Sequence, residues 1–325
     1  MADAIRLQGV RKTFGQKVAV RSMDLAIPEG SLYGFLGPNG AGKSTTIRMI
    51  MSILFPDEGR IEVLGRKSAV ESKDRIGYLP EERGVYRKMK VGAFLEYMAR
   101  LKGVSGSGLR PRIGEWLERV ELPDVQRRRC EELSKGMQQK VQFLAAIIHE
   151  PDLLILDEPF SGLDPINMRL MRNMIQEQQQ RQGVTVIFST HVMSQAEAIC
   201  DHVVMINKGE KVLDDPIDAL RARYDASAIV FEPLAPGADL APLEAVAGVA
   251  GVARDGAQAE VTLAPGADTG AVMRGLAAAV APARLELRRP TLEDIFVEKV
   301  TEGARVTAAQ VRDALHEPTA AEVAR

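Results

Sequence analysis

A glycine-rich turn near the amino terminus constrains this chain more than any other feature. Residues 37–44 read Gly-Pro-Asn-Gly-Ala-Gly-Lys-Ser, which fits the Walker A pattern G-x-x-x-x-G-K-[S/T]. A short apolar run at 32–36 precedes the turn, and a helix-like stretch at 43–54 follows it. The chain is therefore expected to contain a strand, a phosphate-binding loop and a helix in direct succession, inside an α/β domain.

The residue types in this turn suit a nucleotide phosphate for physical reasons. Glycines let the backbone curl so that successive N–H groups point inward around a phosphate, and the helix beginning near Lys43 adds the positive end of its dipole. Lys43 would place its charge on the β- and γ-phosphates, while the Ser44 hydroxyl would ligate Mg²⁺. The residues predicted to bind ATP here are Gly37, Pro38, Asn39, Gly40, Ala41, Gly42, Lys43, Ser44 and Thr45.

A second element supports the first. The apolar run at 153–156 ends in Asp157 and Glu158, which is the Walker B arrangement of a buried strand followed by acids. Asp157 is predicted to help hold Mg²⁺. Glu158 is placed to orient and deprotonate an attacking water as a general base.

The rest of the chain divides by pattern and composition. Strands are expected at 4–10, 18–27 and 185–189, and helical spacing runs from 91 to about 148. The Met-rich stretch 167–181 is predicted to be a packed helix face. The chain turns rich in Ala, Gly and Pro near Asp225, where a small α+β domain is expected, with strands at 227–232, 258–263 and 284–287 and helices at 240–246 and 270–280. The predicted domains are 1–224, with a helical subdomain at about 82–150, then 225–303, then a helical or flexible tail at 304–325.

The charge balance, the cysteine count and the lengths of the apolar runs limit the classes of partner and the compartment that are expected for this chain. The 42 Lys and Arg nearly balance 44 Asp and Glu, which argues against a dominant nucleic-acid-binding surface. Two cysteines cannot form a disulfide framework, so a reducing cytosolic compartment is expected. The most apolar stretches, 151–156 and 275–283, are far shorter than the ~20 residues of a membrane helix, and the charged amino terminus does not match a signal peptide. Any work at a membrane should therefore go through a partner.

Further segments resemble those of ABC transporter ATPases, in the family's order and spacing across about 4–222. Leu133-Ser134-Lys135-Gly136-Met137 resembles the LSGGQ signature, Ser161-Gly162-Leu163-Asp164 the D-loop, and Ser189-Thr190-His191 the switch histidine. Phe14 occupies the position of the aromatic that stacks on adenine. The resemblance implies a P-loop NTPase cassette, with a mixed sheet core and a helical subdomain, followed by a small α+β domain.

The resemblance also implies a division of labour between two copies. Two cassettes dimerise head to tail around ATP and Mg²⁺, so that Ser134 and Gly136 of one face the γ-phosphate held by Lys43 of the other. Asp164 carries the signal across the dimer, and His191 contacts the γ-phosphate.

Some residues depart from the family pattern. Lys135 and Met137 stand where Gly and Gln are common, and Glu81 replaces the Q-loop glutamine. Glu81 can still reach Mg²⁺ or the attacking water, but it adds charge. The surrounding YLPEERG sequence (78–84) and the PTLEDIF sequence (290–296) resemble ABC-2 exporter cassettes of sodium-efflux and drug-resistance systems.

The function expected on these grounds is the ATP-hydrolysing subunit of a membrane exporter, a homodimer at the cytoplasmic face of the membrane bound to separately encoded permease subunits. Residues 82–88 are the candidate coupling contact. The alternative is a soluble ABC ATPase of DNA repair or translation, although only 114 positions separate Lys43 from Asp157, which leaves no room for long coiled coils, and only one cassette is present. A P-loop GTPase would need Asn-Lys-x-Asp, and Glu210 stands where that Asp belongs.

Several other residues receive structural interpretations. His149, His202 and His316 have no partners at ligand spacing and are expected to be structural or exposed. Trp116 is expected to pack in the helical region. The Arg127-Arg128-Arg129 run is interpreted as a solvated loop, with a lipid-headgroup or partner contact as the alternative.

Overall fold

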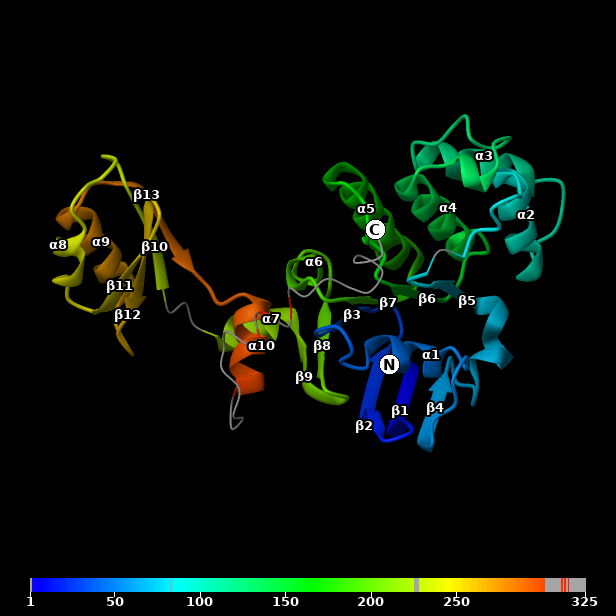
Figure 1. Ribbon diagram of the computed structural model, residues 1–325, viewed down its shortest axis with the longest axis horizontal. Coiled ribbons are helices and arrows are strands. Elements are labelled where there is room, and N and C mark those ends of the chain that lie inside the picture. Colours follow the sequence, from blue (N-terminus) through cyan, green and yellow to red (C-terminus); the bar gives the residue numbers. More distant parts are fainter. Residues whose placement is uncertain are drawn as a thin grey trace. The chain divides into compact units, whose positions relative to one another are not determined.

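The structure is a computed structural model that describes residues 2–82, 84–224 and 228–301 and the single positions 311, 313 and 315 (Figure 1). The chain forms two compact units, Met1–Ile217 with Phe296–Arg325, and Asp218–Ile295. The domain boundaries at 224 and 303 stay a prediction. Several predictions concern residues outside the described part of the chain. These are most of the predicted tail, His316, and residue 227 of the strand expected at 227–232.

The centre of the first unit is a six-stranded mixed sheet in the order β5-β6-β7-β3-β8-β9. Five strands are parallel and β9 pairs antiparallel with β8. Because both faces are covered, β3 and β6 are buried at every position, as dense apolar runs predict. The strands are β3 (Leu32–Leu36), β5 (Ile76–Leu79), β6 (Leu153–Asp157), β7 (Thr185–Thr190), β8 (His202–Asn207) and β9 (Glu210–Pro216).

A three-stranded antiparallel sheet in the order β2-β1-β4 covers α1 (Lys43–Ile50) and shares its core with the six-stranded sheet. Its strands are β1 (Asp3–Phe14), β2 (Lys17–Pro28) and β4 (Glu58–Val63). The first two are longer than predicted, because their hairpin continues to the pair Phe14–Lys17. Helix α1 is shorter than predicted, because Ser52 takes a left-handed φ of 55° just after the helix.

Three helices form the region between β5 and β6, namely α2 (Val91–Leu101), α3 (Leu109–Arg119) and α4 (Lys135–Ile147) (Figure 1). The predicted face of α2 is buried at Val91, Phe94 and Leu95, but Leu101 is 54% exposed because it is the last residue of the helix. Trp116 is buried in α3, as predicted.

Helix α5 (Pro165–Gln182) follows β6, and the short α6 (Met193–Glu197) follows β7. Met171, Met174 and Ile175 are buried, so the Met-rich stretch is a packed helix face, as predicted. Two 3₁₀ segments also belong to this unit. They are Ala69–Arg75, which is interrupted by a kink at Ser72, and the single turn Cys130–Glu132.

The second unit contains a four-stranded antiparallel sheet in the order β11-β12-β10-β13, with a core that includes Phe231, Leu243 and Leu276. The strand β11 was not predicted, because its Gly- and Ala-rich sequence has weak strand character. The predicted helix at 240–246 is a single turn. The elements after β9 are α7 (Ile217–Arg223), β10 (Ala228–Pro233), α8 (Ala241–Glu244), β11 (Val249–Asp255), β12 (Gln258–Leu263), α9 (Thr269–Ala279), β13 (Pro282–Arg288) and α10 (Leu292–Thr301), which belongs to the first unit from Phe296 onward. Among the described residues, no helix has both the length and the apolar character needed to cross a bilayer.

Candidate nucleotide-binding site

The sheet topology brings the predicted motifs together at one edge. Strand β7 lies between β3 and β6, and all three are parallel, so their carboxyl ends meet at the same edge of the sheet. The pairs Leu36–Thr190 and Asp157–Ser189 place the three ends level with one another. The glycine loop, the Asp157-Glu158 pair and His191 therefore leave the sheet side by side.

The glycine loop takes a backbone path that other residues could not follow. Gly37 has a φ of 146°, and a Cβ there would lie 2.1 Å from the carbonyl oxygen of Ile206. Gly42 has a φ of 112°, and its Cβ would lie 2.6 Å from the carbonyl oxygen of Ala19. Both approaches are shorter than van der Waals contact, so glycine is required at both positions. Helix α1 begins directly after Gly42.

Lys43 is held inside this loop. Its side chain is buried, and Nζ donates hydrogen bonds to the carbonyl oxygens of Gly37 at 2.7 Å and Pro38 at 3.1 Å. Burial lowers the pKa of Lys43, although the nearby carboxylates of Glu158, Asp157 and Glu81 act in the opposite direction. The ammonium group is thus hydrogen-bonded to the loop backbone, and the negative charges of the nearby acids stabilise its charged form.

Asp157 is arranged as a cation ligand. Oδ1 accepts hydrogen bonds from the hydroxyls of Ser44, at 3.3 Å, and Ser189. Oδ2 is buried and has no hydrogen-bond partner among the described residues. A buried orphan oxygen beside the Ser44 hydroxyl fits Mg²⁺, which prefers hard oxygen ligands. Burial raises the pKa of Asp157 because it penalises the charged form.

Glu158 has a strained backbone and an oriented side chain. Its φ is 50°, a left-handed conformation that costs a non-glycine residue about 1–3 kcal/mol and occurs preferentially at functional sites. Its N–H donates to the carbonyl and hydroxyl oxygens of Ser189, each at 3.2 Å. Oε1 lies 2.9 Å from Nδ1 of His191. The strand end β7 therefore holds both the backbone and the carboxylate of Glu158.

A hollow of about 340 Å³ joins these parts. Phe14, at the end of β1, forms one wall and is 49% exposed, with the Lys12 ammonium 5.6 Å from the centroid of its ring, so the exposed part of the ring can stack on a base. Glu81 faces the hollow too, and burial raises its pKa, with the charges of Asp157 and Glu158 adding to the effect. The predicted site residues that line the hollow are Phe14, Asn39, Gly40, Ala41, Gly42, Lys43, Ser44, Thr45, Glu81 and Glu158.

The structure adds residues that the sequence analysis did not identify. Lys17 and Ala19 line the hollow because the β1–β2 hairpin folds back next to the loop. Ser189 orients Asp157 from the neighbouring strand. In the sequence, Lys17 and Ala19 could have been identified from their closeness to Phe14. Ser189 could have been identified because it lies two residues before His191.

Seven predicted residues do not line this hollow. Four of them hydrogen-bond to residues that do, namely Gly37, Pro38, Asp157 and His191. The other three lie at the amino ends of helices. Ser134 is the N-cap of α4 and accepts a hydrogen bond from the N–H of Met137 at 3.3 Å. Gly136 lies in the first turn, where an added Cβ would meet only Leu163, at 3.5 Å. Asp164 is the N-cap of α5. Hydrogen bonds from the backbone and side-chain N–H groups of Asn167, and then from the N–H of Ile166, hold the pKa of its carboxyl below the usual value. These residues are therefore helix caps or open helix ends within a single copy.

The sequence that approached a GTPase base-recognition motif is a hairpin. Lys208 and Gly209 have φ values of 48° and 80°, as a two-residue turn between β8 and β9 requires. Asn207 pairs with Glu210 across the turn.

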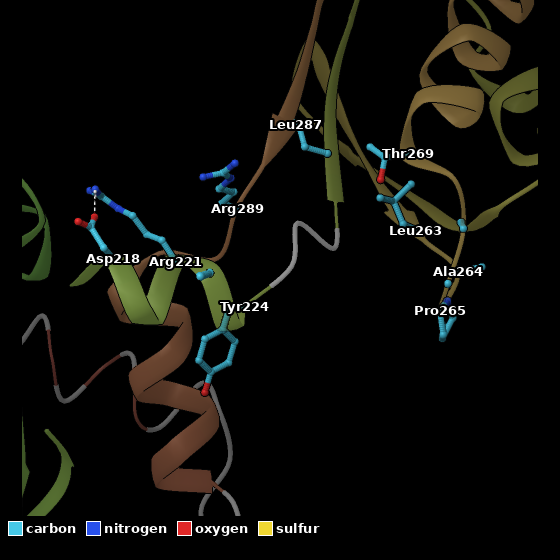
Figure 2. A pocket seen from close by; sticks show the side chains of 12 residues that line it. Asp218, Arg221, Tyr224, Leu263, Ala264, Pro265, Thr269, Leu287 and Arg289 are labelled. Carbon is cyan, nitrogen blue, oxygen red and sulfur yellow. Dashed lines mark ion pairs between the residues drawn. The ribbon is translucent and has the colours of Figure 1, made fainter. Parts of the chain in front are cut away.

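A larger hollow, of about 1060 Å³, lies in the second unit (Figure 2). Its charged side chains, Asp218, Arg221 and Arg289, are exposed, and Asp218 pairs with Arg221 at 3.6 Å. These side chains do not form the arrangement of cation, carboxylates and loop amides found in the smaller hollow. The chemistry of the chain is therefore placed in the first unit.

Comparison with known proteins agrees with this geometry. A family model described as "ABC transporter" matches residues 20–161, and one described as "ATP-binding protein DrrA1-3-like, C-terminal domain" matches 216–300. The chain is 38% identical to an uncharacterized ABC transporter ATP-binding protein, YhaQ of Bacillus subtilis, over 91% of this chain and 98% of the relative. It is 32% identical to the daunorubicin resistance ATP-binding protein DrrA3 of Streptomyces coeruleorubidus, over 95% and 100%.

A solved structure of an ATP-binding subunit of an ABC transporter has the same fold, with a TM-score of 0.63 and 28% identity over 68% of this chain and 92% of that chain. The predicted fold class and the predicted ATPase family are confirmed. The chain belongs to the ABC transporter ATP-binding proteins, as a nucleotide-binding ATPase cassette with a carboxyl-terminal domain of the DrrA type.

Proposed function

We propose that this chain powers a membrane exporter by ATP-driven dimerisation at the cytoplasmic face of the membrane, beneath separately encoded permease subunits. The observation that carries the proposal is an incomplete site. The hollow collects the loop, the acids and Phe14, while the exposed Ser134 and the open turn at Gly136 lie outside it. A second copy, placed head to tail, would bring these two residues to the γ-phosphate, where the amino end of α4 donates backbone hydrogen bonds.

Within each site the residues take separate roles. Lys43 and the loop amides bind the phosphates, and Phe14 stacks on the base. Ser44, Asp157 and Glu81 would hold Mg²⁺, which neutralises charge on the β- and γ-phosphate oxygens when bound. Glu158 accepts a proton from the attacking water. The water oxygen bonds to the γ-phosphorus while the bond from that phosphorus to the leaving ADP breaks. His191 orients the Glu158 carboxylate, and Asp164 would carry the signal across the dimer.

Export is supported by the relatives. The drug-resistance relative DrrA3 is matched along its whole length, and the second unit matches the carboxyl-terminal model named after such proteins. The soluble alternative in repair or translation finds no support in the region between β5 and β6, where three helices of 11, 11 and 13 residues form a compact subdomain with no room for a long coiled coil.

The test is the oligomeric state. Light scattering after size exclusion should show a dimer with Mg²⁺ and a non-hydrolysable ATP analogue, and a monomer with ADP. The Lys43→Ala variant, which lacks the phosphate-binding cation, should stay monomeric under both conditions. A chain that remains monomeric with the analogue, even beside its membrane partner, would contradict the proposal.

The second unit is proposed to stabilise or regulate the dimer. Truncation after Arg223 would also remove α10, whose Phe296 is buried and groups with the first unit. Replacement of 228–290 by a flexible linker is the sharper test. Unchanged dimerisation and transport in that variant would argue against both roles.

A further inference from the structure

We propose that Gln139 and Gln142, two buried glutamines of α4, are positioning residues that transmit movement of the signature end of this helix to Glu158 and Glu81. The inference rests on the proposed function, because it takes Ser134 at the start of α4 to engage the nucleotide of a second copy. The two glutamines are three residues apart and therefore lie on the same face of the helix. Each is only 5% exposed, so their amides face the protein interior.

Gln139 reaches the segment that carries the catalytic carboxylate. Its Nε2 donates a hydrogen bond to the carbonyl oxygen of Pro159, at 3.2 Å. Pro159 directly follows Glu158, whose left-handed backbone depends on its surroundings to persist. A shift of α4 would therefore move the peptide next to the strained residue.

Gln142 reaches the segment that carries Glu81. Its Nε2 donates a hydrogen bond to the carbonyl oxygen of Glu82, at 3.1 Å. Gly84 lies next to the same amide, because a Cβ added there would be 3.4 Å from Nε2. Glu81 and Glu158 are thus each one residue away from a carbonyl that α4 holds.

The other end of the Gln142 amide carries the second observation. Only the NH₂ end of an amide can donate to a carbonyl, so the bond to Glu82 fixes the orientation of the side chain. Oε1 is then buried with no hydrogen-bond partner among the described residues. A buried acceptor without a hydrogen-bond partner destabilises the fold and calls for an explanation. This acceptor is satisfied when α4 moves against residues 80–82, so that the amide favours the rearranged state.

The carboxyl end of α4 is attached to β5, the strand that leads to Glu81. Just beyond the helix, Nε2 of His149 lies 3.2 Å from the carbonyl oxygen of Ile76, at the start of β5. Burial lowers the pKa of His149 to about 4, so the ring is neutral near pH 7 and the contact is an ordinary hydrogen bond. With β5 held at Ile76 and the next segment held at Glu82, a tilt of the amino end of α4 is transmitted to Glu81.

The test uses Gln139→Met and Gln142→Met, which keep the length of the side chain and remove the donor. Gln179→Met is the matched control. Nε2 of Gln179 also donates to a distant backbone carbonyl, that of Gly30 at 2.9 Å, but Gly30 precedes β3 and lies at the opposite end of that strand from the glycine loop.

Two readouts distinguish coupling from mere packing. Loss of one hydrogen bond should lower kcat by about five- to tenfold in each variant, with the KM for ATP within about twofold of the unmodified value. Hydrogen exchange at 80–82 and 158–161 should respond to Mg²⁺ and an ATP analogue in the unmodified chain, and this response should fall by about half in both variants. The Gln179→Met variant should match the unmodified chain in both measurements.

An unchanged kcat and an unchanged exchange response in the two variants would overturn the proposal, as would equal effects in the control. If the Met variants do not fold, Gln139→Asn and Gln142→Asn, which keep the amide but shorten its reach, carry the same expectations. Failure of the unmodified chain to dimerise would count against the proposed function. Normal dimerisation with unresponsive glutamine variants would count against this inference alone.

Discussion

Nδ1 of His191 lies 2.9 Å from Oε1 of Glu158, in a bond that joins the end of β7 to the end of β6. A carboxylate can only accept a hydrogen bond, so Nδ1 must carry the proton. The ring and the carboxylate therefore orient each other within a single copy of the chain. This contact adds to the role expected from the sequence, in which His191 met only the γ-phosphate.

Replacing Glu158 by Gln should abolish turnover while ATP stays bound. Loss of a general base lowers the rate by about a hundredfold or more, so a dimer trapped by ATP should appear in size exclusion. Glu150→Gln is the control. Glu150 is exposed, lies in the loop before β6, and forms an ion pair with Arg112 of α3. Near-normal hydrolysis in Glu158→Gln would show that another group is the base.

His191→Ala should lower kcat by about ten- to a hundredfold, which corresponds to one hydrogen bond to a charged group. His191→Gln retains a donor and should recover part of the loss. His202→Gln is the control, because His202 contacts Asp214 and stacks on Tyr33 away from the hollow. Equal activity of the Ala and Gln variants would mean that His191 does not act through this bond.

Glu81→Gln should strengthen the binding of metal-free ATP by about fivefold, measured by fluorescent-nucleotide titration in EDTA. The change removes one of the three carboxylates that lie near the phosphate loop. Burial raises the pKa of Glu81, and the charges of Asp157 and Glu158 raise it further, which shows that the three acids repel one another. Glu82→Gln, on the exposed neighbour, should bind like the unmodified chain. Identical affinities would place the Glu81 carboxylate away from the phosphates.

The coupling surface predicted at 82–88 is best tested at Tyr86. Tyr86 is 51% exposed and packs edge-on against Phe94 and Tyr97, whereas Val85 is buried, so an Asp at Val85 would harm folding first. Tyr86→Asp should abolish stimulation of the ATPase by the membrane partner and leave nucleotide affinity unchanged. Leu234→Asp, at an exposed apolar residue of the second unit, is the control. Full stimulation of Tyr86→Asp would remove this surface from consideration.

Acid should destabilise the first unit through His149. The folded pKa is about 4 and the unfolded value 6.5, so between these pH values the unfolded state binds more protons and stability falls as pH falls. The loss from pH 7 to pH 5 should be about 2 kcal/mol, measured by urea unfolding with the fluorescence of Trp116, the single tryptophan. In His149→Gln, which keeps a donor for Ile76, this part of the pH dependence should disappear. An unaltered pH dependence would assign it to other groups.

The sequence was sufficient for the parts of the molecule that local chemistry dictates. Gly37 and Gly42 indicate the phosphate loop because no other residue fits their backbone, and the dense apolar run before Asp157 is typical of a strand covered on both faces. Helix α5 was evident from Met171, Met174 and Ile175 at helical spacing. These features can be predicted from the sequence because they depend only on residues that are close together in the chain.

Other features depend on residues far apart in the chain. The hydrogen bonds from Ser189 to Asp157 and from His191 to Glu158 exist because β7 lies next to β6, a strand order that no local pattern contains. The edge strand β11 forms because β12 supplies its partners, despite a weak sequence signal. The links from Gln139 and Gln142 to the acidic segments likewise appear only after α4 has packed, since hydrogen bonds across 20 and 60 residues are set by packing and not by propensity.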